Sequence, residues 1–361
     1  MIKYVLKRIV AMIPTLFGIT LITFFIINLA PGDPVATQFG AGNEQEAEGG
    51  GGQDQDRQSD AIKAKKELLG MLAEDRSVFV WDPQTHIDGE VAPLYWDRRL
   101  GAFEGWIHAL VPMGDNWVVA GDEGTLFVLD AGGSVVSSMA GHALPVWSLA
   151  LSPDGKTLAS ADIEGNLRIW RGGVEIAMAK GDNKPIRDLS FTGDGSGILA
   201  ASNGGAIYLY DAETASVKRT FNGHNSGAYA IALAPDGEHF WSGGYDRTLR
   251  YWSVDNAEPL HEFKGHGQAI NDIAVADDKV ATACDDRMVR LFSFDGSNLG
   301  EPQVFEGHYK QVTAIAIRPD GKQLFSGGRD ETIRLWDVGT GKLVAQTPEK
   351  TPEAKVEAPV S

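Results

Sequence analysis

The sequence predicts an all-β fold, a propeller of six full four-stranded blades plus a partial seventh, preceded by one N-terminal transmembrane helix. Two observations favour the propeller. Gly-His pairs recur at 141, 223, 265 and 307, and an alternating apolar strand and a turn follow each pair. Units of about 40 residues with this pattern are typical of blades arranged around an axis. A third observation, one long apolar segment near the N-terminus, predicts the helix.

The apolar segment runs from Ile9 to Leu29 and contains no charged residue. Its length matches the roughly 20 residues that cross a bilayer core. Lys3, Lys7 and Arg8 precede it, so the positive-inside rule predicts a single-pass protein of the cell inner membrane, with a cytoplasmic N-terminus and an extracytoplasmic propeller. A cleaved signal peptide is the alternative, but the run is longer than the usual apolar region of such a peptide.

The first 35 residues, "MIKYVLKRIVAMIPTLFGITLITFFIINLAPGDPV", carry the motifs "IPTL" and "LAPGDP". They resemble the first transmembrane helix of the permease subunit of bacterial dipeptide and oligopeptide ABC transporters. "DAIKAKKELLG" at 60–70 is similar to the helix that follows in those permeases. The resemblance implies ABC transporter permease and ATPase subunits as partners. We find no second apolar run long enough to span a bilayer, so this chain alone is not expected to form a translocation path.

These motifs predict the domain organisation. Residues 1–35 are expected to form the permease-like transmembrane helix, and residues 36–59 a flexible acidic Gly-rich linker. Residues 60–74 are expected to form a short helix, and residues 75–347 the propeller. The Pro- and Glu-rich tail, residues 348–361, is expected to be disordered.

The closure of the ring is the least determined part of the predicted propeller. Six units carry four strands each, and "KLVAQT" at 342–347 completes the last of them. The earlier segments "SVFVWD" and "APLYWDRR" supply only two more strands. The ring closes either as six blades with a hairpin at the seam or as a seven-fold ring with an incomplete blade. We favour the second form.

The repeats resemble the WD-repeat family, and "GGRDETIRLWD" at 327–337 carries the resemblance most clearly. In that family four side chains of one blade form a hydrogen-bonded set: the His of Gly-His, a Ser or Thr of the second strand, an Asp of the tight turn and the closing Trp. The Asp accepts a hydrogen bond from the imidazole. Such buried polar groups are tolerated only when each has a partner.

The resemblance implies four such sets in this sequence. Two are complete, namely His224, Ser242, Asp246 and Trp252, and His308, Ser326, Asp330 and Trp336. A third comprises His266, Thr282 and Asp286, with Phe292 in place of Trp, and a fourth comprises His142, Ser160 and Trp170, with Glu164 in place of Asp. The blades that start near residues 106 and 182 lack the His and are expected to have weaker internal ties. Because the sets fall in separate blades, we interpret them as structural.

Six other positions are candidates for a partner-binding face. Each follows the first apolar residue of a predicted inner strand, a position that often lies near the mouth of a propeller. The residues are His108, Trp147, Arg187, Tyr229, Asn271 and Thr313. Aromatic and Arg side chains carry a large share of binding energy in protein interfaces, so a protein or peptide partner is expected. The alternative is that Trp147 and Tyr229 only pack between blades.

Composition narrows the function classes. A formal net charge of −17 predicts that no nucleic acid binds, because its phosphates would be repelled. Cys284 is the single cysteine of the sequence, which excludes an internal disulfide and a thiolate metal cluster. The sequence shows no nucleophile, paired acids or metal-ligand cluster, so we expect no enzyme activity, no catalytic or metal site and no cofactor.

The sequence therefore favours a membrane-anchored WD-repeat propeller that acts as a protein-interaction scaffold, associated with a peptide-type ABC transporter. The alternative is the N-terminal part of a dipeptide/oligopeptide ABC transporter permease that carries an inserted propeller. That protein would be active in transmembrane transport only together with the missing helices. Both hypotheses place the membrane contact at residues 9–29.

Overall fold

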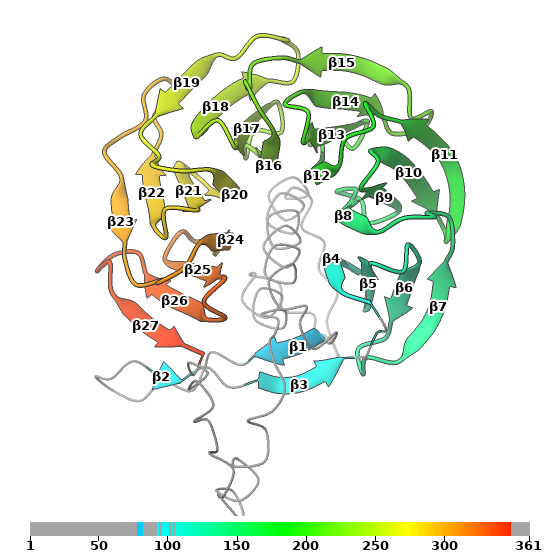
Figure 1. The fold of residues 1–361 in the computed structure, drawn as a ribbon, viewed down its shortest axis with the longest axis horizontal. Helices are drawn as coiled ribbons and strands as arrows, with labels where there is room; N and C mark the ends of the chain where they lie inside the picture. Colours follow the sequence, from blue (N-terminus) through cyan, green and yellow to red (C-terminus); the bar gives the residue numbers. More distant parts are fainter. Residues whose placement is uncertain (1–77, 82–91, 94–95, 101–102, 104, 348–361) are drawn as a thin grey trace, which may run out of the picture.

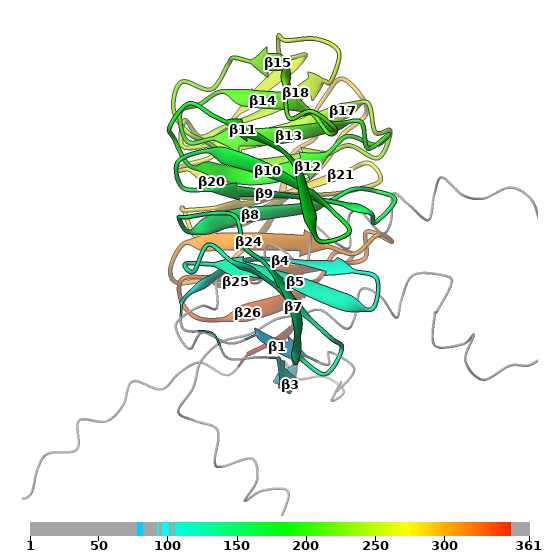
Figure 2. The same ribbon diagram turned by 90° about the vertical axis from the view of Figure 1, so that its right-hand side faces the viewer.

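The computed structural model describes residues 78–81, 92–93, 96–100, 103 and 105–347. Within these residues it shows six blades of four antiparallel strands arranged radially around a central axis, one of which is extended by a fifth strand (Figure 1). Figure 2 shows that the strands run across the thickness of this ring. The six full blades of the prediction are therefore confirmed.

Several sequence predictions concern residues outside this description. They are the transmembrane segment 9–29 within residues 1–35, the linker 36–59, the short helix 60–74 and the tail 348–361. Among the residues that the structure does describe, no helix is long and apolar enough to cross a bilayer.

The first three blades each follow the chain from the innermost strand to the outermost. The first blade comprises β4 (Ile107–Met113), β5 (Asn116–Gly121), β6 (Leu126–Leu129) and β7 (Val135–Met139). The second comprises β8 (Val146–Leu151), β9 (Thr157–Asp162), β10 (Asn166–Arg171) and β11 (Val174–Lys180). The third comprises β12 (Ile186–Phe191), β13 (Gly197–Ser202), β14 (Ile207–Asp211) and β15 (Val217–Phe221).

The other three blades repeat this plan. The fourth comprises β16 (Ala228–Leu233), β17 (His239–Gly244), β18 (Thr248–Ser253) and β19 (His261–Lys264). The fifth comprises β20 (Ile270–Ala276), β21 (Lys279–Cys284), β22 (Val289–Ser293) and β23 (Gln303–Phe305). The sixth comprises β24 (Val312–Ile317), β25 (Gln323–Gly328), β26 (Ile333–Asp337) and β27 (Leu343–Gln346).

The partial seventh unit differs from the two-stranded prediction in one respect. β1 (Val78–Trp81) pairs antiparallel with β3 (Trp96–Leu100), in the ring position between the sixth and first blades (Figure 1). The start of the second predicted strand, β2 (Ala92–Pro93), separates from β3 and pairs in parallel with β27. An added strand covers the edge of the sixth blade, where backbone groups would otherwise lack ladder partners.

Asp-Gly turns join the first and second strands of four blades. Gly155, Gly195, Gly237 and Gly321 have φ between 64° and 71°, a conformation that glycine adopts without steric cost. The preceding Asp accepts a hydrogen bond from the amide two residues later, as between Asp154 and Lys156 at 3.1 Å. These turns allow each pair of strands to reverse direction within a few residues.

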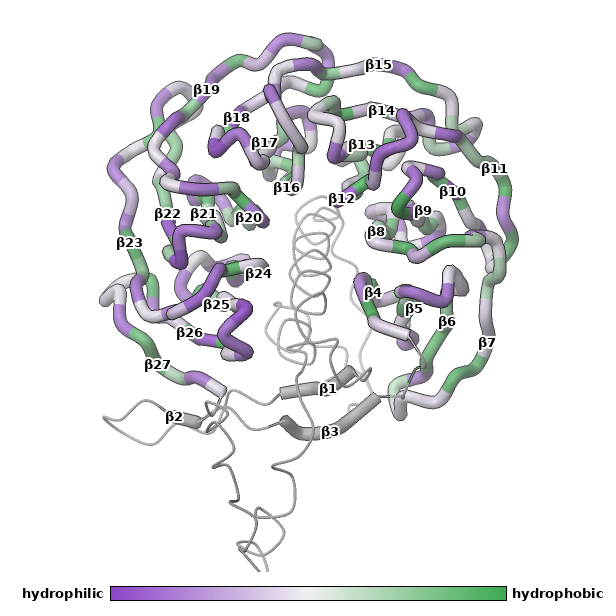
Figure 3. The backbone as a smooth tube through the Cα atoms, viewed as in Figure 1, coloured by the Kyte–Doolittle hydropathy of each residue, from purple (hydrophilic) through white to green (hydrophobic). Residues whose placement is uncertain are grey.

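The core lies between adjacent blades. Five apolar clusters each join one blade to the next, from the first and second blades to the fifth and sixth. Every residue of β9 and of β13 is buried, whereas β11 at the rim alternates between exposed and half-buried residues. Figure 3 shows hydrophobic colours along strands such as β6 and β8 and hydrophilic colours in many connecting loops. The propeller is therefore a stack of sheets held face to face.

Two buried aspartates form hydrogen bonds between adjacent blades. Asp188 in the third blade accepts a hydrogen bond of 2.8 Å from the amide of Ile231 in the fourth. Asp272 in the fifth blade accepts one of 2.7 Å from Ile315 in the sixth. Both carboxylates also accept from the amide of the following residue. The sequence reading missed them, although an acid within an otherwise apolar inner strand was the available signal.

Candidate functional site

The six candidate partner-binding residues share one structural feature, a β-bulge near the start of each inner strand. In all six blades the register between the first and second strands shifts across the second residue of the inner strand. A bulge re-aims the extra side chain away from the regular ladder. We call these six residues the bulge ring, listed by blade as His108, Trp147, Arg187, Tyr229, Asn271 and Thr313. The face of the propeller at which the inner strands begin is the bulge face.

Four members of the bulge ring contact one another in order across four blades. The His108 and Trp147 rings meet edge-on with centroids 6.1 Å apart. The guanidinium carbon of Arg187 lies 4.9 Å from the Trp147 ring centroid and 4.7 Å from that of Tyr229. Cations stacked on aromatic faces at this distance are attracted by the ring quadrupole. The stack continues from Tyr229 to Tyr245, whose rings are 6.1 Å apart.

The other two members contribute differently. The Asn271 side-chain amide donates to Asp285 at 2.7 Å and to the backbone carbonyl of Val312 at 2.8 Å, so it ties the fifth blade to the sixth. Thr313 is half-buried. The structure thus brings His108, Trp147, Arg187 and Tyr229 into one stack and leaves Asn271 and Thr313 outside it.

A second ring of side chains lies beside the bulge ring and was missed from the sequence. Each of its members directly follows the second strand of a blade. Each donates its amide to the carbonyl of the residue that precedes the inner strand. The six residues, which we call the amide ring, are Asp122, Ile163, Asn203, Tyr245, Asp285 and Arg329. In the four blades with a His set, the available signal was the position three residues after the Ser or Thr of the set.

Large aromatic residues are also exposed on the bulge face. The exposed fractions are 50% for Trp106, 60% for Tyr245 and 53% for Tyr309. Each lies in a loop next to the start of an inner strand, and Tyr309 is held by a hydrogen bond of its hydroxyl to the Asp330 carbonyl. Exposed aromatic residues of this kind are enriched in protein interfaces.

The hydrogen-bonded sets inside the blades have the expected geometry in the fourth and sixth blades. In the sixth, His308 Nε2 lies 2.8 Å from Ser326 Oγ, and Trp336 Nε1 donates to the same oxygen at 2.8 Å. His308 Nδ1 donates to Asp330 at 2.9 Å, since an ionised carboxylate only accepts. The fourth blade repeats these contacts through the corresponding residues, His224, Ser242, Asp246 and Trp252. These side chains are buried inside single blades and are structural.

The set in the second blade corrects the sequence prediction of Glu164. His142 Nδ1 contacts Asp162, not Glu164, at 3.0 Å, while Ser160 bonds both His142 and Trp170. The sixth blade has Gly328 where the second has Asp162. A Cβ at Gly328 would lie 2.7 Å from His308 Nδ1. A short acidic side chain at this position therefore reaches the imidazole directly.

The set in the fifth blade is incomplete, which corrects the role expected of Asp286. His266 Nε2 bonds Thr282 at 2.9 Å. Asp286 instead pairs with Arg290 at 2.8 Å, and His266 Nδ1 is buried without a hydrogen-bond partner among the described residues. Phe292, which replaces the closing Trp, has no group to donate. Burial, helped by the charge of Arg290, lowers the pKa of His266 to about 4.

The blades without the His use other polar ties. In the third blade Asp182 follows Gly181, where other blades have His, and it accepts from Ser202 Oγ at 2.7 Å. In the first blade Asp122 accepts from the Trp106 amide at 2.9 Å and contacts His108 Nε2 at 2.8 Å. The two blades are thus tied by hydrogen bonds that the sequence reading did not identify.

The electrostatics of the sets favour ionised carboxylates. Burial raises the pKa of Asp330, but the hydrogen bonds from His308 and Thr332 outweigh it and leave that pKa below its usual range. The same balance lowers the pKa of Asp162 and of Asp246. These acids therefore hold the imidazoles in place as charged acceptors at neutral pH.

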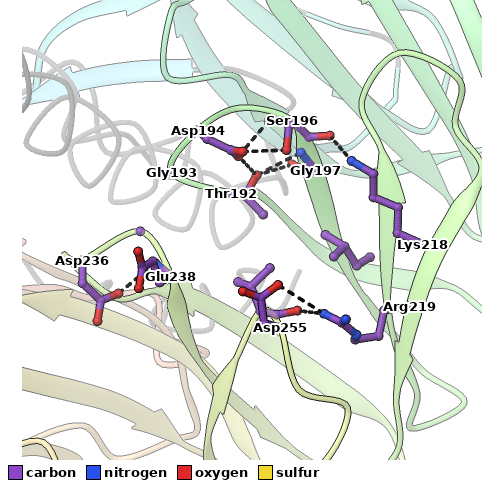
Figure 4. Close-up of a pocket in the computed structure, with 13 residues that line it drawn as sticks. Thr192, Gly193, Asp194, Ser196, Gly197, Lys218, Arg219, Asp236, Glu238 and Asp255 are labelled. Atoms are coloured by element: carbon purple, nitrogen blue, oxygen red, sulfur yellow. Dashed lines mark hydrogen bonds and ion pairs between the residues drawn. The ribbon is translucent and has the colours of Figure 1, made fainter.

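A cavity of about 610 Å³ lies between the third and fourth blades, on the face opposite the bulge face (Figure 4). It is lined by the turns that contain Asp194 and Asp236, and by Lys218 and Arg219 of β15. Lys218 pairs with Asp211 at 3.0 Å, and Arg219 bonds the Val254 carbonyl. Because both cations already have partners, the cavity offers no free positive group to a ligand.

Two observations on the described part of the chain concern catalytic and metal chemistry. Burial raises the pKa of the Cys284 thiol to about 11, so it is not an activated nucleophile at neutral pH. No group of three or more His, Cys, Asp or Glu residues in the described ranges is arranged to hold a metal ion.

Comparison with known protein families gives four matched segments, at 133–171, 215–253, 257–293 and 300–337. All four match the family described as "WD domain, G-beta repeat". Each segment runs from the outermost strand of one blade through the three inner strands of the next blade, and contains one of the sets around His142, His224, His266 and His308. These four segments are thus similar to WD repeats. The WD-repeat propeller predicted from the sequence is thereby supported, and these matches contain nothing that shows a permease-like N-terminal segment.

Several curated proteins are similar to the WD-repeat region. Apoptotic protease-activating factor 1 of Rattus norvegicus is 28% identical over 239 residues, which cover 63% of this chain and 19% of that protein. The ribosome biogenesis protein WDR12 homolog of Chlamydomonas reinhardtii is 29% identical over 58% of this chain and 46% of its own length. WD repeat-containing protein 1 of Mus musculus is 28% identical over 57% and 36%. The chain spans less than half the length of each of these relatives.

Proposed function

We propose that this protein is an interaction scaffold whose WD-repeat propeller binds a protein or peptide partner on the bulge face. The observation that carries the proposal is the continuous stack of His108, Trp147, Arg187 and Tyr229. Four successive blades each contribute one side chain through a bulge. Trp, Tyr and Arg held rigidly in one surface are the residue types that dominate binding energy in protein interfaces.

The exposed aromatic residues support the same surface. Trp106, Tyr245 and Tyr309 lie in loops of the bulge face and are each at least half exposed, and Tyr245 contacts the stack through Tyr229. Burial of aromatic side chains contributes strongly to interface stability. The similarity to other WD-repeat proteins is consistent with a binding module and does not name a partner.

We further propose that residues 9–29 tether this scaffold to the cell inner membrane, with the propeller on the extracytoplasmic side. The support is the apolar segment and its basic flank, Lys3, Lys7 and Arg8. The permease-like motifs favour partners among the permease and ATPase subunits of a peptide-type ABC transporter. The alternative remains a permease fragment with an inserted propeller. In both cases the propeller binds and does not catalyse.

Affinity purification in mild detergent tests the scaffold proposal. The full chain carries a tag after Ser361, and bound proteins are identified by mass spectrometry. We expect one or more partners to be retained by the parent chain and lost, by about tenfold or more, from a Trp147→Ala, Tyr229→Ala double variant. A matched double variant at the rim, Val174→Ala with Met178→Ala, should retain them.

The identity of the retained proteins decides between the two contexts. Permease helices and an ATPase would support the transporter component. Only extracytoplasmic proteins, or proteins without membrane spans, would support an independent tethered scaffold. Equal retention by the parent and the Trp147, Tyr229 double variant would overturn the assignment of the bulge face as the binding surface.

A further inference from the structure

The bulge face carries unpaired arginines although the whole chain is acidic. Arg187 belongs to the bulge ring and Arg329 to the amide ring, while Arg247 and Arg287 occupy the tight turns that follow β17 and β21. All four are exposed. Among the residues described by the structure, no carboxylate forms a hydrogen bond or an ion pair with any of their side chains. The exposed acids Asp122, Glu123 and Glu164 lie in the corresponding turns of the first and second blades, so the exposed arginines of the bulge face are gathered on the third to sixth blades.

The nearby acids are already occupied by groups of their own blades. Asp246 accepts from His224 and pairs with Arg250 at 3.0 Å. Asp286 pairs with Arg290, and Asp330 accepts from His308. Asp285 accepts from the Asn271 amide. The blade sets therefore use these carboxylates, and the arginines of the same loops remain available to an external acceptor.

The aromatic stack determines how Arg187 is presented. Trp147 and Tyr229 lie 4.9 Å and 4.7 Å from its guanidinium carbon, so the stacked faces of the guanidinium are covered by rings. Its donors lie in the plane of the group and point along its edge. A guanidinium held in this way loses less side-chain entropy when it binds a carboxylate through two parallel hydrogen bonds.

The charge of Arg329 adds to this arrangement. Desolvation of the guanidinium lowers the pKa of Arg187 most, and the positive charge of Arg329 lowers it as well, whereas the charges of Asp188 and Asp285 act in the opposite direction. Arg187 still stays protonated at neutral pH, since arginine is not deprotonated in proteins. An anion bound at this face would be attracted by both cations as well as forming its own hydrogen bonds.

We propose that the bulge face recognises an acidic segment of an extended peptide, with a carboxylate side chain bound at the edge of Arg187 and a second near Arg329. The inference rests on the proposed function, because it names the chemistry of the partner that the same face binds. Trp147, Tyr229 and Tyr245 supply the apolar contact, and Arg247 and Arg287 extend the positive surface along the peptide. The scaffold thus prefers negatively charged peptides over neutral or positively charged ones.

Fluorescence anisotropy with labelled peptides tests this inference on the full chain in detergent. We expect fluorescein-labelled hexaglutamate to bind, and hexaglutamine and hexalysine to bind at least about tenfold more weakly. Binding of hexaglutamate should weaken steadily as NaCl is raised from about 0.05 to 0.5 M, since salt screens charge pairs. Inorganic phosphate serves as a competitor and should displace hexaglutamate only weakly, because it cannot contact both arginines and the aromatic residues.

Matched variants distinguish the contribution of individual arginines to peptide binding from the effect of the net charge of the protein. Arg187→Gln and Arg329→Gln should each weaken hexaglutamate binding by about tenfold. Arg187→Lys should recover only part of it, because lysine lacks the planar fork. Arg171→Gln removes the same charge at the end of β10, where Arg171 pairs with Glu213, and should leave binding unchanged. Unaltered thermal unfolding of each variant excludes a folding defect.

The outcomes distinguish this inference from the proposed function. Equal binding of the three peptides, or equal loss in Arg171→Gln and Arg187→Gln, would overturn acidic recognition. If proteins captured by the parent chain still depend on Trp147 and Tyr229 while hexaglutamate does not displace them, the scaffold proposal stands and the acidic specificity is wrong. Complete displacement by phosphate alone would mean an anion site without peptide recognition and would also contradict the inference.

Discussion

Replacement of Trp252 by Ala is expected to lower the free energy of unfolding by about 3–5 kcal/mol, the usual cost of removing a large buried aromatic side chain. Trp252 is fully buried. Its ring packs against Phe240, with centroids 5.9 Å apart and nearly parallel planes, and against Phe221. Its indole nitrogen donates to Ser242 Oγ at 2.8 Å. The substitution therefore removes packing and a hydrogen bond at the same position.

Urea unfolding followed by circular dichroism measures this effect, and two variants serve as controls. Trp252→Phe keeps a ring, as Phe292 does in the fifth blade, and should cost about 1 kcal/mol for the lost hydrogen bond plus a smaller packing loss. Trp106→Ala, at a side chain that is 50% exposed, should change the free energy by less than about 0.5 kcal/mol. Equal effects of Trp252→Ala and Trp106→Ala would contradict the role assigned to the closing Trp.

Acidification is expected to destabilise the propeller through His266. Its pKa in the folded chain is about 4, below the ordinary value of 6.5. The unfolded chain therefore binds a proton at a higher pH than the folded chain does, so the stability is fully present above pH 6.5 and is lost as pH falls towards 4. The difference between these two pKa values corresponds to at most about 3–4 kcal/mol.

The same unfolding experiment at pH 7.5, 6, 5 and 4 measures this loss. His266→Gln removes the titrating group, so the difference in stability between parent and variant should shrink by about 2–3 kcal/mol from pH 7.5 to 4. The value at pH 7.5 serves as the reference for each protein. Below about pH 4 the acids of the blade sets, whose pKa values are lowered, should add a further loss in both proteins. A constant difference across this range would show that His266 is not held neutral by its surroundings.

The blade architecture was predictable because it follows from short-range patterns. Strands that alternate apolar and polar residues, Asp-Gly turns and Gly-His pairs each depend on residues that are close in the sequence. The Gly before His224 illustrates this point, since a Cβ at Gly223 would lie 2.8 Å from the Trp252 ring. The alternating strands recur in every full blade, and the Asp-Gly turns and the Gly-His pairs each recur in four of them. Together they predict the number of strands and their order.

The partner of each buried group was less predictable, because it depends on distances between residues that are not adjacent in sequence. Asp162, rather than Glu164, contacts His142, because its shorter side chain lies at the position that is Gly328 in the sixth blade. Asp286 pairs with Arg290 and leaves His266 Nδ1 without a partner among the described residues. Spacing alone did not distinguish these arrangements.

The sequence identified the positions of the bulge-ring residues, but it did not predict how their side chains are arranged. The predicted residues follow the first apolar residue of each inner strand, and the structure places a β-bulge at all six. The order of the stack, with Arg187 between Trp147 and Tyr229, depends on which blades are neighbours. The amide ring was missed because its residues share a backbone hydrogen bond and no residue type.

The most direct test of the account places a photoreactive phenylalanine analogue at position 245, on the bulge face, in the full chain expressed in its host. The same analogue at position 174, on the exposed edge strand β11, is the matched control, since the parent side chains are 60% and 65% exposed. Irradiation followed by mass spectrometry identifies proteins crosslinked at each position. The account predicts a defined partner crosslinked at position 245 and absent at position 174. A partner crosslinked only at position 174 would contradict the assignment of the bulge face as the binding surface.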